Sequence, residues 1–532
     1  MVATKIKLVS SCLLLDEKNE CVKMHDLVRD VAHLIAKNEN KIIKCEVEKD
    51  VTIEQNSVRC LWCVKFPNDL DCSNLEFLFL KTKLEELDGI FKRMEILKVL
   101  ILVNDNVGIT PLSTMSLKTL TNIRYLVISD YELSDFTFVN NMKKLQSLSL
   151  NDCSLPLFPE LQTNAAISQI TTLKLLQFYR CKMKGKNFEV IKRTPRLEEL
   201  YIVEENWKAN SEDNIQFFNT FSVPQTLQRY AIVLGSKDFY YNYNYLHPPP
   251  RTLLLNHFDI SNEVIKGLAK KATDLFVANI QGGAKNIIPD IFQIEGGSLD
   301  ELKMFEVRDS EEIECLIETS NHLSEVVTLF SKLHTLKMNN MKNLRALWHY
   351  FQPANGSFEN LEKLYISDCP LLTSLFTYVV ARCLVQLKIL YISGCDGLKH
   401  ILADDEKTEK SQGEFATGHP IQIFQNLQEV EIYRCKELKD IFSTSVVRGL
   451  AQLKELKIRE CNMLIQIFGD IDPLAYQDEK ELVEIVEEGK HPHLYSTSTP
   501  STTVVNNNPG TFSFLLILNM FKRVLGSLYV IA

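Results

Sequence analysis

The chain lacks the signatures of several large classes of protein. Its 532 residues contain no H-E-x-x-H motif, no G-x-S-x-G motif and no ordered pair of carboxylates on one element, so we expect no enzymatic activity. Basic residues are also scarce relative to acidic ones: 59 Lys and Arg stand against 68 Asp and Glu, which gives a formal net charge of -9. Without a basic excess we expect no nucleic-acid partner.

Clear signals for export or membrane insertion are missing as well. The opening MVATKIKLVSSCLLL has a short apolar run but no convincing cleavage site, so we expect a cytoplasmic chain with its 14 cysteines reduced. The closing TFSFLLILNMFKRVLGSLYVIA is apolar, but Asn519, Lys522 and Arg523 interrupt it. A membrane-spanning helix needs about twenty mostly apolar residues. We therefore favour an atypical apolar tail over residues 511–532 that is not part of the repeat fold, rather than a membrane anchor.

The chain contains an internal sequence repeat, with four similar copies between Phe358 and Phe468. The copies begin at Phe358, Leu384, Phe424 and Leu450 and read FENLEKLYISDCPLLTSLF, LVQLKILYISGCDGLKHIL, FQNLQEVEIYRCKELKDIF and LAQLKELKIRECNMLIQIF. Their shared frame is apolar-x-x-Leu-x-x-Leu/Val-x-Ile-x-x-Cys, followed by a second apolar pair. This frame is typical of the leucine-rich repeat.

The spacing of the repeat predicts which side chains are buried. Leu364 and Ile366 are two residues apart on a strand, so both point into the core, and Lys363, Tyr365 and Ser367 must point outward. One repeat cannot bury its own apolar side, so repeats stack. We therefore predict an α/β fold: a leucine-rich-repeat solenoid (horseshoe) with a concave parallel β-sheet and with loops and short helical turns outside.

Weaker copies of the frame extend the array toward the N-terminus. They begin near Leu75 and recur roughly twenty to forty residues apart, which gives about fifteen repeats over residues 74–470. Residues 41–73 alternate apolar and polar residues, so we expect short strands that cap the first repeat. Residues 471–510 form an acidic and Ser/Thr/Asn-rich linker. Inside the array, the tyrosine-rich segment 239–250 is either a recognition loop or a partly buried loop, and 403–418 is a charged, solvated insertion.

Several cysteines occupy one position of the repeat, where the chain turns away from the strand. They are Cys153, Cys181, Cys369, Cys395, Cys435 and Cys461. We interpret them as structural thiols that satisfy backbone groups of the turn. Cys60 and Cys63 form an isolated C-x-x-C pair without a second pair or a histidine frame, so we favour a structural role over a zinc site and expect no metal.

The first forty residues are not repeat-like. A strand-like run from Cys21 leads into Met24-His25-Asp26 and then into apolar residues at helical spacing, from Leu27 to Ile35. On the residues alone, His25 and Asp26 could simply start that helix, where an acidic residue suits the helix dipole.

With the repeats that follow it, SCLLLDEKNECVKMHDLVRDVAHLIAKNE resembles the end of the winged-helix part of NB-ARC in plant coiled-coil nucleotide-binding leucine-rich-repeat disease resistance proteins. The resemblance implies that residues 1–40 are a remnant of that winged helix, with Met24, His25 and Asp26 as a vestigial nucleotide-sensing motif. It also implies innate immunity (plant defence), through repeats that recognise a pathogen effector or a guarded host protein and regulate an NB-ARC switch domain. The partners would then be that effector or host protein and the NB-ARC domain of a receptor.

The chain departs from this family in one large respect. The family's P-loop, G-x-x-x-x-G-K-[ST], is missing: Gly-Lys occurs only at Gly185 and Gly489, without the preceding glycine, and no coiled-coil domain is present. ADP or ATP would be cofactors only of full-length members, so we expect none here. Two other interpretations stay open: a generic leucine-rich-repeat adaptor of the ubiquitin-ligase type, and a truncated, non-functional receptor.

Outward strand positions of neighbouring repeats lie side by side, about 5 Å apart, and so form one surface. We predict a protein-binding concave face there, with the tyrosines as a staggered stripe flanked by charges. The alternative is that these are isolated surface tyrosines, which are common on strands. Its residues are Lys363, Tyr365, Ser367, Tyr391, Ser393, Glu429, Glu431, Tyr433, Glu455, Lys457 and Arg459, with Ile389 between them.

Because the chain has no P-loop, we expect no saturable ADP or ATP binding despite Met24, His25 and Asp26. Isothermal titration calorimetry with either nucleotide should give only heats of dilution. Saturable ADP binding that a His25→Ala change abolishes would contradict this expectation.

Overall fold

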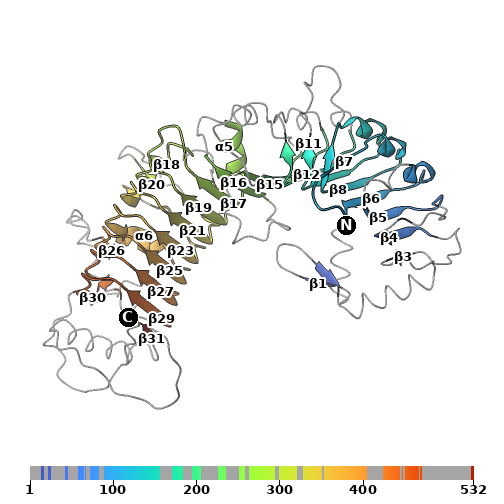
Figure 1. Ribbon diagram of the computed structural model, residues 1–532. Coiled ribbons are helices and arrows are strands. Elements are labelled where there is room, and N and C mark those ends of the chain that lie inside the picture. The colour runs from blue at the N-terminus through green and yellow to red at the C-terminus, as the bar shows by residue number, and fades with distance from the viewer. Residues whose placement is uncertain are drawn as a thin grey trace, which may run out of the picture. The chain divides into compact units, whose positions relative to one another are not determined.

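The fold is known from a computed structural model (Figure 1). The residues that the structure describes are 14–16, 22–24, 42–45, 58–64, 66, 72–82, 89–155, 171–183, 194–204, 226–234, 251–257, 263–293, 299–319, 328–349, 353–403, 423–443, 446, 450–465, 468–469 and 529–531. The chain divides into two compact units, Met1–Asn256 and His257–Ala532, and each is described by itself.

Unit 1 opens with a short antiparallel hairpin. Strands β1 (Leu14–Asp16) and β2 (Val22–Met24) pair so that Leu14 lies opposite Met24. The strand-like run predicted before the Met24 motif is therefore a strand. His25, Asp26 and the helix predicted from Leu27 lie outside the described residues.

A parallel sheet follows in unit 1, with one strand from each repeat. Its strands are β3 (Ile42–Cys45), β4 (Cys60–Cys63), β5 (Phe77–Thr82), β6 (Val99–Asn104), β8 (Tyr125–Ser129), β10 (Ser147–Asn151), β12 (Leu175–Tyr179), β14 (Glu199–Glu204), β15 (Arg229–Leu234) and β16 (Arg251–Asn256). Each pairs in parallel with the next in chain order. The strands predicted in 41–73 are present, and β3 and β4 extend this same sheet.

The other side of the unit 1 core carries short elements. The 3-10 helices η2 (Ile90–Arg93), η3 (Ser116–Thr119) and η4 (Thr137–Asn141) match the predicted helical turns. A second small parallel sheet, which was not predicted, comprises β7 (Thr110–Leu112), β9 (Tyr131–Leu133), β11 (Ser154–Leu155) and β13 (Lys182–Met183).

Unit 2 repeats the same two-layer plan. Its main parallel sheet contains β17 (Asp274–Ala278), β19 (Met304–Arg308), β21 (Thr335–Asn339), β23 (Lys363–Ser367), β25 (Ile389–Ser393), β27 (Glu429–Tyr433) and β29 (Glu455–Arg459). Across the core lie helices α5 (Glu263–Ala269) and α6 (Tyr378–Cys383) and the short parallel groups β18 (Asn286–Ile288), β20 (Cys315–Glu318), β22 (Ala346–His349); β24 (Ser374–Phe376), β26 (His400–Leu402); and β28 (Phe442–Ser443), β30 (Phe468–Gly469). Figure 1 shows the main strands of each unit stacked side by side.

The apolar tail differs from its prediction at its end. Strand β31 (Tyr529–Ile531) pairs in parallel with β29, with Tyr529 opposite Glu455. The expectation that the whole tail stays outside the repeat fold is therefore wrong for these three residues, because the free edge of β29 offers unpaired backbone groups to a further strand. In the described part of the chain, no helix has the length and apolar character to cross a membrane.

Burial alternates along many strands of the two main sheets as the repeat predicts, whereas β15, β16 and β17 are buried at nearly every position. In β23, Leu364 and Ile366 are 0% exposed, whereas the residues on either side of them are half-buried. The same alternation occurs in β21, β27 and β29. At β21, β23, β27 and β29 the core therefore lies between the main sheet and the short outer elements, and the opposite face of the sheet is left open.

Most strands of the main sheets are followed by a residue with left-handed backbone geometry, which turns the chain toward the core. Asp368 has φ 52° and Arg434 has φ 51°, and Gly394, with φ 65°, stands at the equivalent position. The cysteine that follows points inward, and its thiol donates to the carbonyl two residues earlier: Cys369 to Ser367 at 3.3 Å and Cys435 to Tyr433 at 3.4 Å. The predicted backbone role of the ladder cysteines is confirmed at these positions.

Three predicted segments fall where the chain is not described. They are the tyrosine-rich segment 239–250, the insertion from residue 404 to 418 and the linker 471–510. Their proposed roles stay predictions.

The two faces of β25 give a matched test of the register. Leu390 is 0% exposed in the core, and its neighbour Tyr391 lies on the open face. Leu390→Ala should lower the free energy of unfolding by about 2–5 kcal/mol, because it leaves a cavity. Tyr391→Ala should cost under about 1 kcal/mol. Urea unfolding followed by circular dichroism measures both, and equal losses for the two variants would contradict the assigned faces.

Candidate functional site

The candidate site is the open face of unit 2, defined as the outward side chains of strands β19 to β29. The strand registers arrange these side chains in three rows. The first row is Met304, Thr335, Lys363, Ile389, Glu429 and Glu455; the second is Glu306, Lys337, Tyr365, Tyr391, Glu431 and Lys457; the third is Arg308, Asn339, Ser367, Ser393, Tyr433 and Arg459. Because backbone pairing sets the spacing, the rows form one continuous surface.

The three tyrosines touch one another across successive strands. The ring centroids of Tyr365 and Tyr391 are 6.0 Å apart with an interplanar angle of 42°. Those of Tyr391 and Tyr433 are 5.7 Å apart with an angle of 45°. Tilted pairs at this distance are favourable for aromatic rings. The predicted staggered stripe is therefore present, and we call these three residues the tyrosine stripe.

Charged side chains extend both ends of the stripe. At one end the ammonium of Lys337 lies 5.3 Å from the centre of the Tyr365 ring, within the range of a cation–π contact, and 3.9 Å from Glu306. At the other end Glu431 accepts a hydrogen bond from the Tyr433 hydroxyl at 3.3 Å and pairs with Lys457 at 2.7 Å. The face is therefore pre-organised by its own contacts.

The surroundings raise the pKa of two hydroxyls of the tyrosine stripe, those of Tyr365 and Tyr433. Burial raises the pKa of Tyr365, and the carboxylates of Glu429 and Glu431 raise it further. Burial followed by the charge of Glu431 raises the pKa of Tyr433. At neutral pH these hydroxyls are therefore neutral groups that can donate hydrogen bonds. Burial also raises the pKa of Glu306, where the Lys337 ammonium only partly offsets it.

Most of the predicted site residues lie on this face as expected. Half-buried positions hold Lys363, Tyr365, Ser367, Tyr391, Glu429, Glu431, Tyr433, Glu455, Lys457 and Arg459. Ser393 is the exception: it is only 5% exposed, although it lies between Ser367 and Tyr433 in the third row. It therefore offers almost no contact area to a partner.

Sequence reasoning missed Lys337, which supplies the cation at Tyr365. Its repeat departs from the frame, because Met341 stands where stronger copies have cysteine. The register pairs Lys337 directly with Tyr365. Its outward position in the repeat copy at Leu333 could therefore have predicted this neighbour from the sequence.

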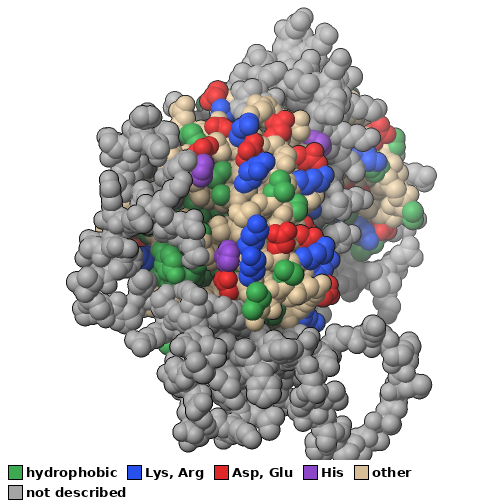
Figure 2. Space-filling view, turned by 90° about the vertical axis from the view of Figure 1, so that its left-hand side faces the viewer, with side chains coloured by type: hydrophobic (Ala, Val, Ile, Leu, Met, Phe, Trp, Pro, Cys, Tyr) green, Lys and Arg blue, Asp and Glu red, His purple; other side chains and the backbone are tan. Residues whose placement is uncertain are grey.

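Exposed ion pairs also occur outside the open face of unit 2, on the surface that we call the flank, at residues such as Lys285, Glu314, Asp396 and Lys436. Ion pairs link neighbouring repeats there, such as Lys285 with Glu314 at 2.9 Å and Lys436 with Asp396 at 2.7 Å. Figure 2 shows basic and acidic side chains interleaved over the face in view. Exposed pairs of this kind contribute little stability, and their charges largely cancel.

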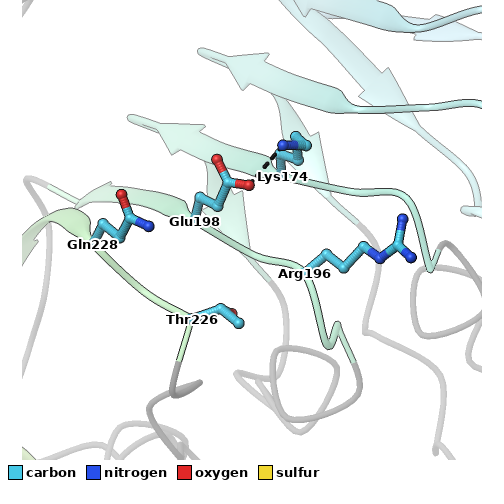
Figure 3. Close-up of a pocket in the computed structure, with 5 residues that line it drawn as sticks. All are labelled: Lys174, Arg196, Glu198, Thr226 and Gln228. Carbon is cyan, nitrogen blue, oxygen red and sulfur yellow. Dashed lines mark hydrogen bonds and ion pairs between the residues drawn. The ribbon is translucent and has the colours of Figure 1, made fainter.

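A shallow polar hollow of about 360 Å³ lies in unit 1, just before strands β12, β14 and β15 (Figure 3). Lys174 pairs with Glu198 at 2.6 Å, and the Thr226 hydroxyl donates to the Leu197 carbonyl at 2.7 Å. Arg196 points away from that ion pair in Figure 3. Three of the five lining side chains are thus occupied with repeat-to-repeat contacts, and none of the five is arranged as a nucleophile beside a base.

The C-x-x-C pair lies at the two ends of β4. Cys63 is buried and its thiol contacts the Phe79 carbonyl at 3.9 Å, whereas Cys60 is half-buried. Within the described part of the chain, no three His, Cys, Asp or Glu residues are grouped so that they could hold a metal ion.

One parallel strand per repeat, an inward Leu–Ile pair and a turn cysteine define the chain as a leucine-rich-repeat solenoid protein. A solenoid of this class is typically an interaction scaffold.

Sequence comparison finds a more specific similarity for the repeats of unit 2. Residues 266–396 and 416–462 match the family model described as plant disease resistance protein RPS2-like, leucine-rich repeats. Both segments lie in unit 2. Among curated proteins, none matches the chain by sequence.

Solved structures give only distant likenesses. A leucine-rich-repeat protein of Leptospira interrogans is 16% identical, covers 79% of this chain and 95% of its own, and has a TM-score of 0.41. Toll of Drosophila, solved with Spätzle, is 14% identical over 77% of this chain and 53% of its own, with a TM-score of 0.40. A plant peptide hormone receptor, RGFR1 with RGF2, is 12% identical over 84% and 68%, with a TM-score of 0.36. At TM-scores this low the likenesses do not inform function.

Proposed function

We propose that this chain is the recognition part of a plant disease resistance receptor that acts in the cytoplasm. Its repeats bind a pathogen effector or a guarded host protein, and they regulate an NB-ARC switch domain. The observation that carries the proposal is the tyrosine stripe and its flanking charges, which lie within the segment similar to resistance-protein repeats. The Met24-His25-Asp26 motif at the N-terminus supports the link to a switch domain.

The open face has the chemistry of a protein-binding surface. Tyrosine is enriched at binding hot spots because a rigid ring buries a large apolar area and its hydroxyl still finds a polar partner. The rings here are fixed by one another and by Lys337 and Glu431, so ordering them on binding costs little entropy. Neighbouring carboxylates and ammonium groups then set which partner is accepted.

A pull-down from plant extract or with candidate effectors tests this function. The triple variant Tyr365→Ala, Tyr391→Ala and Tyr433→Ala should lose most of the partner, since each hot-spot truncation can cost roughly 2 kcal/mol or more. Circular dichroism should first establish that the variant is folded.

The matched control changes three tyrosines at outward strand positions of unit 1. They are Tyr125, Tyr179 and Tyr201, all replaced by Ala. This control should retain the partner. Undiminished binding by the folded unit 2 variant, with loss in the control, would move the site to unit 1 and contradict the proposal.

A further inference from the structure

On the open face of unit 2, three charged side chains stand apart from the network that holds the others, and two of them lie in one row. Lys337 is engaged with Glu306, Arg308 with Asp309, and Lys457 with both Glu431 and Glu455. The side chains of Lys363 and Glu429, by contrast, make no hydrogen bond or ion pair with any described residue, although their backbone amides donate to the His334 and Lys388 carbonyls. A third group, Arg459, also has none, but its Nε is shielded from solvent in the last repeat.

Lys363 and Glu429 belong to one row and have an apolar residue between them. Lys363 lies opposite Ile389 in the sheet, and Ile389 lies opposite Glu429. Along this row the surface therefore presents a cation (Lys363), an apolar side chain (Ile389) and an anion (Glu429). The next row, two residues along the strands, places Tyr365 and Tyr391 beside them. A partner must therefore offer an anion, an apolar group and a cation in a line that crosses the strands.

The spacing of the row discriminates between partner conformations. Neighbouring strands are about 4.8 Å apart, so the three positions fall at roughly 0, 5 and 10 Å. An α-helix carries side chains on one face at i, at i+3 or i+4, and at i+7, which are roughly 5–6 Å and 10.5 Å along its axis. An extended peptide carries them at i, i+2 and i+4, which are roughly 7 and 13 Å along. Over three positions the side-chain spacing of the helix matches the spacing of the row to within about 1 Å, whereas that of the extended chain does not.

We propose that this row receives an α-helix of the partner protein, laid across the strands, with one acidic and one basic side chain seven residues apart and an apolar side chain between them. The acidic group pairs with Lys363 and the basic group with Glu429, while the apolar residue rests on Ile389 and Tyr391. A helix about 10 Å wide covers the first row and the tyrosine row together. The proposal rests on the function proposed above and specifies the partner's recognition element.

The test is a selection from a displayed helical library against the full-length protein. Positions i and i+7 carry only Glu or Lys, and positions i+3 and i+4 carry varied apolar residues. The helix can dock in either direction, so both mixed-charge orders are expected to be enriched. Their enrichment over the Glu–Glu and Lys–Lys helices should be roughly tenfold, since each exposed ion pair adds a modest gain.

Single charge reversals should change the preference in opposite ways. Lys363→Glu makes both ends of the row anionic, so Lys–Lys helices should win. Glu429→Lys makes both ends cationic, so Glu–Glu helices should win. The matched control Lys439→Glu reverses an exposed charge outside the open face and should keep the mixed-charge preference.

The outcomes separate this proposal from the one it rests on. The helix proposal would be overturned if the library yields no enriched helix. It would also be overturned if the unmodified protein, both charge-reversal variants and the control all select the same charge pattern. If selected helices lose binding to the tyrosine triple variant but show no charge preference, the helix proposal fails and the proposed function stands. Selected helices that bind the triple variant undiminished would overturn both.

Discussion

Parallel backbone pairing between one short strand of each repeat is the constraint from which the rest of this structure follows. It fixes neighbouring repeats about 4.8 Å apart and aligns equivalent residues in rows. Inward rows of Leu and Ile build the core, as Leu364 and Ile366 do at 0% exposed. The same pairing aligns the outward residues of successive strands, so they form an ordered surface. Stability and recognition thus depend on alternate residues of the same strands.

The turn after each strand maintains this pairing from one repeat to the next. A residue with positive φ bends the chain, and its amide continues the ladder: Asp368 donates to the Ser393 carbonyl at 2.7 Å, and Gly394 to the Tyr433 carbonyl at 2.9 Å. The following cysteine is buried beside its equivalents, and its neighbour Cys395, together with burial, raises the pKa of the Cys435 thiol to about 12. Such thiols stay protonated and donate to backbone carbonyls, which is a structural use of cysteine.

The stripe of Tyr365, Tyr391 and Tyr433 could be predicted from the sequence, because strand periodicity and the repeat frame fix which residues are neighbours. The contacts of long side chains could not. Lys337 reaches over Tyr365 through rotatable bonds that no periodicity specifies, and Ser393 is only 5% exposed although the repeat places it at an outward position. The outer strands, such as β18, β20 and β22, were also missed, since they are short and follow no alternation.

The pairing of charges explains why one part of the open face is poised for a partner. Exposed charges on the flank and at both ends of the tyrosine stripe are neutralised by neighbours in the next repeat. Between those ends, the row of Lys363, Ile389 and Glu429 keeps its charges available beside aromatic rings that are already ordered. Specificity can therefore reside in a small area of a large repeat surface.

The central claim is that a protein partner covers the open face of unit 2. Hydroxyl-radical footprinting, read by mass spectrometry with and without a captured partner, tests it most directly. The account predicts that the partner lowers the oxidation of Tyr365, Tyr391 and Tyr433 and leaves Tyr125 and Tyr179 in unit 1 unchanged. Protection of the unit 1 tyrosines, with those of the stripe still fully oxidised, would contradict it.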